Sequence, residues 1–596
     1  GRYRRGMSDR QARFSIDRRL RFLQFVILIT VALLVMSLFF FQVIKANEYV
    51  RLASQNRLRI IRMAPPRGTI TDSKGAPLAV NVRTFSVNGY PVDLQKEGNL
   101  KLVSSVLMRN GIPIDEEELK KLIEKQYSAP YRAITVASNL TFAQAAELIT
   151  DRNFSEALFL TPVWKRTYPT GNFTAHVVGY VSEITKDELE AKKESLYRGG
   201  DMIGKNGIEA WYDEDLQGLP GEEVVEVDAR GRKLRDISYS PPQRGSDTVL
   251  TIDLAAQRYA AELIGNFRGA VVAMDVNDGS VKCLYSSPSY DPNPFTWGIS
   301  NKEWAALNDH KERPMMNRAI SGAYPPASTF KIVTASSVLE NKVATTSTTV
   351  RCPGYFELGD RRFRCWQRSG HGTENVMKAL RDSCDVYFYQ TATWLGIDRL
   401  IRTAAKYGVG EKSGIDLIGE ISGTIAGPEW KKERVKENWY GGDTVNYSIG
   451  QGYVLMTPIQ LLRAYAAIAN GGRLPKPRIN SKAVPEYRKL EVSPEIIKIM
   501  QEGLLEVTST GTGRRASSFG IQIAGKTGTA QNAHGEDHAW FAGYAPANAP
   551  RYAVVVIAEA GKGGGAVAGP IVGKMLNFLI NGNKYVEPVP VKPKTE

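Results

Sequence analysis

The chain has 596 residues, of which 43% are hydrophobic and 23% are charged, and 77 Lys and Arg residues against 62 Asp and Glu residues give it a net charge of +15. This composition is that of a globular protein and excludes a mostly disordered chain, while the length predicts two or three folded units. The excess of positive charge is compatible with a nucleic-acid partner or a membrane partner.

The first 44 residues predict a basic tail followed by a membrane anchor. Residues 1–21 carry eight arginines against two aspartates, and Phe22–Ile44 holds no charged residue, no Pro and no Gly. At about 1.5 Å of rise per residue, a helix of this length spans the roughly 30 Å hydrocarbon core of a bilayer. A signal peptide is the alternative, but its apolar segment would be shorter and would end at a small-residue cleavage site.

The arginines also predict the orientation of the anchor. Positive residues are retained on the cytoplasmic side, so we expect residues 1–21 in the cytoplasm and everything after residue 45 across the membrane. No other stretch of 18 uncharged apolar residues occurs, which predicts a single membrane-spanning helix at residues 22–44. A folded part outside the cytoplasm cannot meet nucleic acid, so its positive charge suits anionic surfaces there.

The residues after the anchor predict a mixed domain at 45–243. Residues 47–61 are polar and basic with spaced apolar positions, which favours a helix leading away from the membrane. Four further windows carry strand, turn or helix patterns: a turn, strand, turn and strand at 65–81, amphipathic helices at Ile114–Lys125 and Thr141–Arg152, and a hairpin at Gly218–Leu234.

A domain boundary is expected near Pro241–Asp247, and residues 244–584 predict one α+β domain. Its first strands form a hairpin with an Asn-Asp-Gly turn at residues 277–279. Strands at both ends with helices between them indicate one sheet that the C-terminal part completes. The predicted helices are 328–340, 374–407 and 457–471, and the predicted C-terminal strands are 521–529, 538–545 and 551–559. Residues 585–596 are rich in Pro and Lys and are expected to be disordered.

Ser328 and Lys331 lie in the segment YPPASTFKIV, at the start of a predicted helix. Their spacing places both side chains on one helix face, and the helix N-terminus favours negative charge at the serine. A serine needs a neighbouring base to act as a nucleophile, and a lysine is a base only when its amine is neutral. The pattern is common, however, and a capping serine with a solvated lysine is its ordinary interpretation.

Two later segments supply companions for this pair. The sequence RDSCD provides two polar groups within a predicted helical window, and IAGKTGTAQ provides a second cation and two hydroxyls on a predicted strand. A second cation would lower the pKa of the first lysine, and a glycine on the strand lets a ligand approach its backbone closely. The companion residues are Ser383, Asp385, Lys526, Thr527, Gly528 and Thr529.

Ser-x-x-Lys, Ser-x-Asp and Lys-Thr-Gly, in this order, resemble the motif set of the penicillin-binding transpeptidases and serine β-lactamases. The surrounding segments SSPSYDPN, SIGQGY and GKTGTAQ resemble the class B penicillin-binding proteins, and RGTITDSKGAPLA and GKNGIEAWYDEDLQGLPG resemble their N-terminal pedestal. The resemblance covers nearly the whole chain. It implies a transmembrane helix, an elongated pedestal or dimerisation-like domain at 45–243, and a transpeptidase domain at 244–584.

The resemblance implies a D,D-transpeptidase that cross-links peptidoglycan stem peptides. Ser328 would attack the carbonyl between two terminal D-alanines, Lys331 would accept its proton, and Ser383 would pass a proton to the departing D-alanine. The backbone N–H groups of Ser328 and Thr529 would form the oxyanion hole. Thr527 and Thr529 with Lys526 would hold the terminal carboxylate. The chemistry needs no cofactor, and β-lactams would acylate the serine.

Asp385 departs from the asparagine that most of the superfamily has in the middle motif, so its contact with substrate is left open. An aspartate there is similar to the elongation-type subgroup, penicillin-binding protein 2, and the segments GHGTENV and WYGGDTVNYSIGQGY point the same way. The alternative is a division-type, septal transpeptidase. Elongation-type members imply a SEDS-family glycosyltransferase of RodA type and other elongation-complex membrane proteins as partners.

Three of the four cysteines lie close together in the sequence with a histidine among them. Cys352, Cys365, His371 and Cys384 predict a Cys₃His zinc site, which some elongation-type members share. The alternatives are a Cys352–Cys365 disulfide, which an oxidising compartment permits, and free thiols. Such a metal would brace the neighbouring catalytic motif without taking part in the chemistry. The fourth cysteine, Cys283, is expected to be a buried small hydrophobe.

Two other classes of function compete with the transpeptidase. A β-lactamase-like hydrolase or β-lactam sensor would carry a deacylating glutamate motif or further membrane spans and domains. A catalytically silent β-lactam-binding scaffold would have lost Ser328, Lys331 or Lys526, and all three are present. The single anchor and the pedestal favour the transpeptidase.

Overall fold

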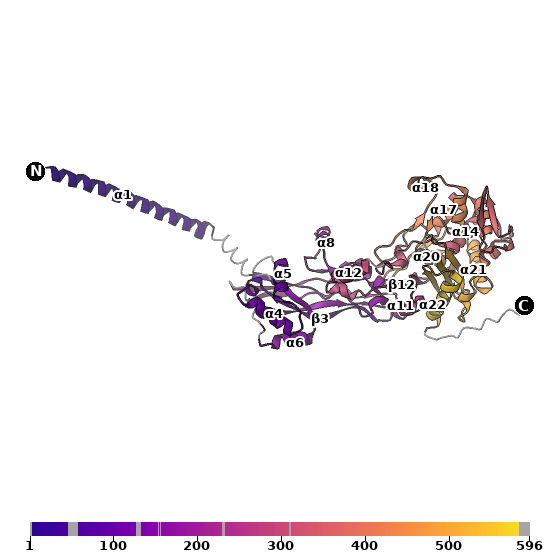
Figure 1. Ribbon diagram of the computed structural model, residues 1–596, viewed down its shortest axis with the longest axis horizontal. Helices are drawn as coiled ribbons and strands as arrows, with labels where there is room; N and C mark the ends of the chain where they lie inside the picture. The colour runs from indigo at the N-terminus through magenta and orange to yellow at the C-terminus, as the bar shows by residue number, and fades with distance from the viewer. Residues whose placement is uncertain are drawn as a thin grey trace.

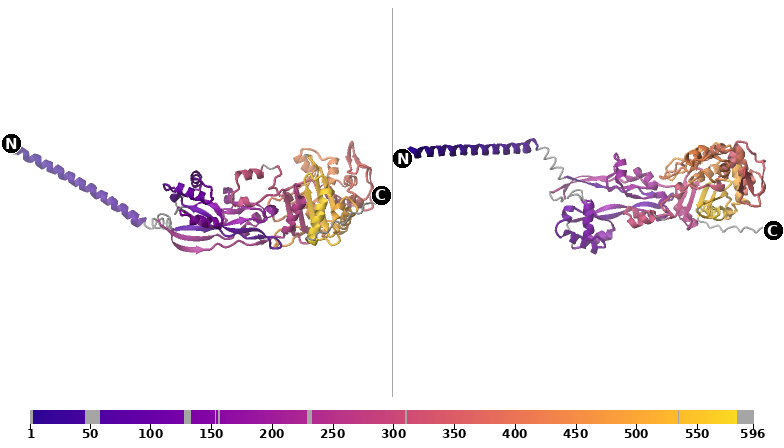
Figure 2. Two further views of the ribbon diagram at one scale, coloured as in Figure 1. Left: turned by 60° about the horizontal axis from the view of Figure 1, so that its bottom comes forward. Right: turned by 45° about the horizontal axis from the view of Figure 1, so that its top comes forward.

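The computed structural model describes residues 3–45, 58–126, 133–152, 154, 157–228, 233–308, 311–533 and 535–582. Beyond the N-terminal helix the molecule is elongated: pedestal strands run along its length, and a larger unit of sheet and helices lies at the end away from the N-terminus (Figures 1 and 2). The predicted α+β architecture is confirmed. The tail expected to be disordered at 585–596 lies outside the described residues.

The N-terminal helix α1 (Tyr3–Phe39) continues into a π-helical turn, η1 (Phe40–Ile44). Its segment Leu20–Ile44 has a mean hydropathy of 2.7, and none of it is buried against the rest of the protein. A helix satisfies its own backbone hydrogen bonds, which is what a lipid environment requires. Among the described residues, this is the one helix long and apolar enough to cross a membrane, and it fits a single-pass anchor.

The first pedestal sheet joins segments that are far apart in the sequence. Its three antiparallel strands, β1 (Leu58–Met63), β8 (Gly221–Val227) and β9 (Lys233–Ser240), lie in that order. Strands β8 and β9 confirm the hairpin predicted there. The helix predicted for 47–61 is wrong at residues 58–61, because β-branched Ile60 pairs with Val224 of β8, and 47–57 lie outside the described residues.

The second pedestal sheet is built on the long strand β3 (Pro77–Gly89), which pairs with β4 (Ile134–Leu140) on one side and β5 (Leu158–Thr167) on the other. Apolar side chains from these strands and from three helices form a separate small core. Two of the helices confirm the predicted amphipathic windows. The helices are α4 (Asn99–Arg109), α5 (Glu116–Gln126) and α6 (Phe142–Thr150).

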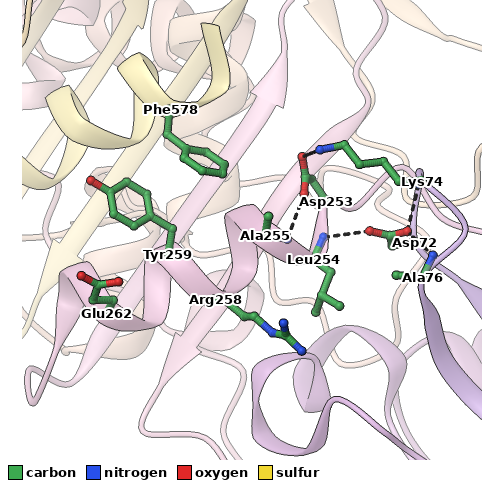
Figure 3. Close-up of a pocket in the computed structure, with 10 residues that line it drawn as sticks. All are labelled: Asp72, Lys74, Ala76, Asp253, Leu254, Ala255, Arg258, Tyr259, Glu262 and Phe578. Carbon is green, nitrogen blue, oxygen red and sulfur yellow. Dashed lines mark hydrogen bonds and ion pairs between the residues drawn. The ribbon is translucent and has the colours of Figure 1, made fainter. Parts of the chain in front are cut away.

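A hydrogen-bonded joint connects the pedestal to the C-terminal unit. Strand β2 (Ile70–Thr71) pairs in parallel with β10 (Thr248–Val249), so the pedestal sheet includes residues beyond the expected boundary at 241–247. The carboxylate of Asp72 accepts the backbone N–H of Leu254 at 3.1 Å. Figure 3 shows this contact beside the ion pair of Lys74 with Asp253, at 2.8 Å. The joint therefore fixes the N-terminus of helix α11 (Leu254–Ile264).

The C-terminal unit contains the sheet that the sequence predicts. Its five antiparallel strands lie in the order β12-β11-β23-β22-β21. Helices α11 and α22 (Gly569–Asn581) pack on one face, and α20 (Pro458–Ala469) packs on the other. The first and last parts of the domain thus complete one sheet. Its strands are β11 (Gly269–Asp275), β12 (Val281–Ser287), β21 (Ala524–Ala530), β22 (His538–Ala545) and β23 (Tyr552–Ala558).

The helices between the two groups of strands carry the remaining motif residues. A 3₁₀ turn, η4 (Ala327–Phe330), leads into α14 (Lys331–Glu340). The predicted helical window 374–407 is interrupted, because Ser383 adopts a left-handed conformation with φ of 55°. The expectation that this motif lies within a helix is therefore wrong. It forms the break between helices α15 (Val376–Arg381) and α16 (Asp385–Leu395), which α17 (Ile397–Lys406) follows.

Candidate active site

Ser328 lies in the 3₁₀ turn at the start of α14 and is partly exposed. A hydrogen bond to another segment fixes this turn: the backbone N–H of Ala327 donates to the carbonyl of Gly450 at 2.9 Å. Gly450 has a φ of 72°, and a Cβ added there would lie 2.2 Å from the carbonyl oxygen of Ala327. A glycine is therefore required at this position for the serine turn to keep its place.

Lys331 lies one helical turn after Ser328, and its side chain is completely buried. Its ammonium donates to the Asp385 carboxylate at 2.7 Å and to the carbonyl and hydroxyl oxygens of Ser383 at 2.9 and 3.2 Å. The left-handed conformation of Ser383 turns both of its oxygens toward the lysine. A buried charge is tolerated only when it is paired and hydrogen-bonded, and Asp385 provides the pairing.

Lys526 reaches the same hydroxyl from the sheet. Its amine lies 2.9 Å from Ser383 Oγ, and its side chain is also completely buried. Burial, together with the positive charge of Lys331, holds the pKa of Lys526 well below its ordinary value of 10.5. The Ser383 hydroxyl therefore lies between an ion-paired ammonium and an amine whose neutral form is favoured.

The outer strand β21 packs its Lys-Thr-Gly-Thr run against the serine turn. A Cβ on Gly528 would lie 3.1 Å from the carbonyl oxygen of Pro326, so the strand and the turn approach each other closely. The hydroxyl of Thr527 lies 3.2 Å from that of Thr512, and Thr529 is exposed at the strand surface. The strand edge beside Ser328 thus presents hydroxyls and backbone groups to a ligand.

The structure brings the predicted residues Ser328, Lys331, Ser383, Asp385 and Lys526 to one place, with Thr527 to Thr529 beside them. Hydrogen bonds form a continuous path from one buried lysine through a hydroxyl to the other. Such a path can move a proton without exposing a charge to solvent. Next to a serine at a helix N-terminus, it provides the arrangement that nucleophilic acyl transfer requires.

Sequence reasoning missed two residues that position this site. The backbone N–H of Trp366 donates to the second Asp385 oxygen at 3.0 Å, and its indole N–H donates to the carbonyl of Ser383 at 3.1 Å. The side-chain amide of Gln451 donates to the carbonyl of Thr529 at 3.4 Å. Trp366 directly follows a predicted ligand and Gln451 lies in the segment SIGQGY, but no local pattern predicts these long-range contacts.

The four predicted metal ligands also meet. Cys352 and Cys365 approach His371 Nδ1 to 3.7 and 3.5 Å, and one ligand atom from each of these residues and from Cys384 lies within 4.8 Å of the others. Tetrahedral zinc with ordinary bond lengths places sulfur and nitrogen ligands about 3.6 Å apart. None of the four described cysteines is in a disulfide, so the alternative bond between Cys352 and Cys365 is not formed.

The thiols of this cluster have pKa values shifted in opposite directions: burial raises the pKa of Cys352, and the contact with Cys365 raises that of Cys384. The Cys384 thiol, with the imidazole of His371, lowers the pKa of Cys365 to about 3, and the thiolate is the form that binds metal. The hydrogen bond between Cys365 and His371 also raises the pKa of His371. His371 Nε2 is buried and has no hydrogen-bond partner among the described residues. The donor set and its spacing therefore fit a structural Cys₃His site.

The cluster connects a small β subdomain to the catalytic motif. Strand β13 (Val350–Cys352) pairs with β16 (Gly372–Glu374), and the hairpin of β14 (Tyr355–Leu358) and β15 (Arg361–Arg364) leads directly into Cys365. Because Cys384 lies between Ser383 and Asp385, a metal here would tie this subdomain to the catalytic loop.

Comparisons with known proteins agree with this geometry. Residues 269–577 match the family model of the penicillin-binding protein transpeptidase domain, and residues 62–250 match that of the penicillin-binding protein dimerisation domain. The peptidoglycan D,D-transpeptidase MrdA of Escherichia coli strain K12 is 35% identical over 94% of this chain and 94% of its own length.

Solved structures give the same result. The complex of penicillin-binding protein PBP2 with MreC from Helicobacter pylori matches with a TM-score of 0.82 and 32% identity, covering 88% of this chain and 99% of that chain. A structure described as a peptidoglycan synthase complex matches with a TM-score of 0.72 and 30% identity, covering 95% of this chain and 100% of that chain. The chain therefore belongs to the class B penicillin-binding proteins, with a dimerisation domain and a transpeptidase domain.

Proposed function

We propose that the chain is a peptidoglycan D,D-transpeptidase that cross-links stem peptides during cell-wall elongation and is inhibited by β-lactams. The observation that carries this proposal is the position of the Ser383 hydroxyl between the buried amines of Lys331 and Lys526. Lys331 itself lies one helical turn after Ser328. The similarity to MrdA of Escherichia coli supports the elongation role. The proposal includes domain limits at 45–243 and 244–584.

The acylation step forms a bond from Ser328 Oγ to the carbonyl carbon between two terminal D-alanines, and the peptide C–N bond then breaks. The backbone N–H groups of Ser328 and Thr529 stabilise the oxyanion, which typically contributes about 3 to 4 kcal/mol per donor. Thr527 and Thr529, with Lys526, hold the terminal carboxylate, and Gly528 lets the substrate backbone approach the strand. D-Alanine leaves with a proton on its amine.

The protonation states of the two lysines determine which of them can act as the general base. Lys331 is ion-paired with Asp385 at 2.7 Å, so it cannot accept a proton until it has released one. Ser383 accepts that proton at 3.2 Å and passes its own to Lys526 at 2.9 Å, where the neutral amine is favoured. Lys331 then takes the proton of Ser328. Ser383 gives its proton to the amine of the departing D-alanine and takes one from Lys526, which restores the starting protonation states.

The second half of the reaction uses the same groups in reverse order. An amine of a second stem peptide attacks the acyl carbon, the bond to Ser328 Oγ breaks, and the amine proton returns through the relay to the serine. The product is a peptide cross-link, and no cofactor takes part. In this scheme Asp385 does not touch substrate: it positions the Lys331 ammonium and holds the Trp366 backbone.

The Cys₃His cluster belongs to the same proposal as a structural zinc site. Cys352, Cys365, His371 and Cys384 would hold the ion, which would supply a rigid crosslink and no reactive group. Because Cys384 lies between Ser383 and Asp385, the metal would fix the left-handed catalytic loop.

Partners and topology follow from the anchor and from the relatives. The eight arginines in residues 1–21 support a cytoplasmic N-terminus and an extracytoplasmic catalytic domain. The Helicobacter pylori relative is solved with MreC, and another relative is solved in a peptidoglycan synthase complex. We extend this to a SEDS-family polymerase of RodA type, which would supply the glycan strands in the plane of the same membrane.

Intact-mass analysis of the full chain in detergent tests the proposal. Incubation with a penicillin should add one penicilloyl group, and Ser328→Ala should remove the adduct. Metal analysis of the same sample should give about one zinc per chain. A folded wild-type protein without an adduct would contradict the transpeptidase assignment.

A further inference from the structure

A groove of about 640 Å³ lies between the β14–β15 hairpin and the segment that joins α18 (Pro428–Arg434) to α19 (Gly441–Ser448). Figure 1 shows α18 at the upper edge of the C-terminal unit, away from the sheet strands of the pedestal. The hairpin tip, Leu358 to Arg361, forms one wall. Residues of the α18–α19 segment and Tyr453 form the other.

The chain segments that form the two walls of this groove lead to contacts in the active site. The hairpin wall leads through Cys365 to Trp366, whose backbone N–H donates to Asp385. The other wall leads from the end of α19 to Gly450, which accepts the N–H of Ala327 beside the nucleophile, and to Gln451, which donates to Thr529. The groove is therefore built from two segments that lead, along the chain, to residues in contact with the serine turn, Asp385 and strand β21.

The charged side chains that line the groove are two cations and three anions, which leave a net charge of −1. The side chain of Lys431 is 3% exposed, and its ammonium lies 2.8 Å from Asp443 and 3.5 Å from Glu437. Arg361 and Asp360 at the hairpin tip add one charge of each sign. An ammonium that two carboxylates already neutralise does not attract an anion, and the lining as a whole does not select a polyanion.

Aromatic rings provide the remaining surface. Tyr440 is 62% exposed, and the Lys431 ammonium lies 5.0 Å from its ring centre and 5.3 Å from that of Tyr453. A Cβ on Gly442 would lie 3.1 Å from the Phe363 ring, so only the small residue lets the hairpin close over α19. Fixed tyrosine faces beside ionised hydrogen-bonding groups suit a ligand with apolar C–H faces and many neutral hydroxyl and amide groups.

We propose that this groove binds the glycan backbone of a peptidoglycan strand whose stem peptide occupies the active site. The N-acetylated sugars lie against Tyr440 and Tyr453, and the exposed carboxylate of Glu437 and the hairpin-tip groups of Asp360 and Arg361 bond their hydroxyl and amide groups. The inference rests on the proposed transpeptidase function and deepens it, because it makes the polymer, and not the stem peptide alone, the substrate that the protein recognises.

Binding of two probes to the full chain in detergent micelles tests the groove. One probe is a glycan strand stripped of its stem peptides by an amidase, and the other is a soluble stem pentapeptide. Tyr440→Ala should weaken binding of the stripped glycan by about tenfold, the loss of one good contact of about 1.4 kcal/mol. Tyr440→Phe, which keeps the ring face, should retain most of the affinity.

Tyr239→Ala is the matched control, because Tyr239 is 64% exposed on β9 of the pedestal, away from the groove. It should bind the glycan as the wild type does. Unchanged glycan binding by Tyr440→Ala would overturn the proposal, and so would a loss confined to the pentapeptide, which would assign the groove to peptide. Acylation of the wild type by a soluble penicillin reports separately on the transpeptidase function: glycan binding without acylation would support the groove and overturn that function.

Discussion

The carboxylate of Asp385 has two partners: one oxygen lies 2.7 Å from the buried Lys331 ammonium, and the other accepts the backbone N–H of the exposed residue Trp366 at 3.0 Å. Asp385 therefore neutralises Lys331 of the Ser-x-x-Lys motif. It also connects the β subdomain to its own Ser-x-Asp motif. Breaking a buried pair costs more than its formation contributes, because the remaining charge is left without compensation.

Asp385→Ala is accordingly expected to lower the free energy of unfolding by about 3 to 5 kcal/mol, the cost of an uncompensated buried charge. Asp385→Asn should recover part of this loss, since its amide oxygen still accepts one hydrogen bond. The thermal unfolding midpoint of the full chain measures both. Asp382→Ala is the control, because its pair with Arg381 is about a quarter exposed and is worth at most about 1 kcal/mol. Equal losses at the two positions would contradict the role given to Asp385.

The lowered pKa of Lys526 predicts a pH profile for acylation. The neutral amine receives the relayed proton, so the rate should rise as pH rises through the lowered pKa and fall as pH drops below it. Second-order acylation rates with a fluorescent penicillin between pH 5 and pH 9 measure this profile. Lys526→Arg, which stays protonated, should acylate about 10²- to 10⁴-fold more slowly.

The exposed Lys476, which pairs with Glu486 at 2.9 Å, provides the control for that substitution. Lys476→Arg should leave both the rate and its pH dependence as in the wild type. A rate independent of pH in the wild type would show that Lys526 is not the proton acceptor.

Motif order and turn chemistry were sufficient to predict most of the residues that meet in the candidate active site and most of the strands of its sheet. Lys526 and Thr529 were expected on a strand, and the Asn-Asp-Gly turn correctly indicated the β11–β12 hairpin. These features depend on neighbours in the sequence or on a motif set that appears as a whole. For the same reason, the apolar run 22–44 predicted the membrane-length helix almost to the residue.

Features set by distant partners could not be predicted in this way. The helical pattern around RDSCD gave no sign that Ser383 is left-handed, because contacts with Lys331 and Lys526 accompany that conformation. Residues 58–61 have spaced apolar positions that fit a helix, yet they form a strand because β8 lies beside them, more than 150 residues later. The contact of Trp366 with Asp385 likewise depends on the folded β subdomain.

The cysteine cluster predicts that metal and loop geometry are coupled. Cys352→Ala should lose the zinc, lower the unfolding midpoint and slow acylation, since metal binding contributes directly to folding and this site includes the residue between Ser383 and Asp385. Cys283→Ala is the control, because Cys283 is also buried but lies on β12, away from the cluster. Metal analysis beside acylation rates measures both effects. Full zinc content in Cys352→Ala would contradict the assigned ligand set.

Replacement of Gly450 tests whether its contact with the serine turn positions Ser328 for acylation. In Gly450→Ala the new Cβ would lie 2.2 Å from the Ala327 carbonyl oxygen, so the turn that carries Ser328 must move. A misplacement of about 1 Å can cost about 10²-fold in rate, and acylation by penicillin should fall by that order. Gly471→Ala separates this effect from backbone strain, because Gly471 has a similar φ of 81° but open space around it. Both variants carry the left-handed cost of about 1 to 2 kcal/mol, but Gly471→Ala should acylate at the wild-type rate. If the two variants acylate alike, strain alone explains the loss and the contact behind Ser328 does not position the nucleophile.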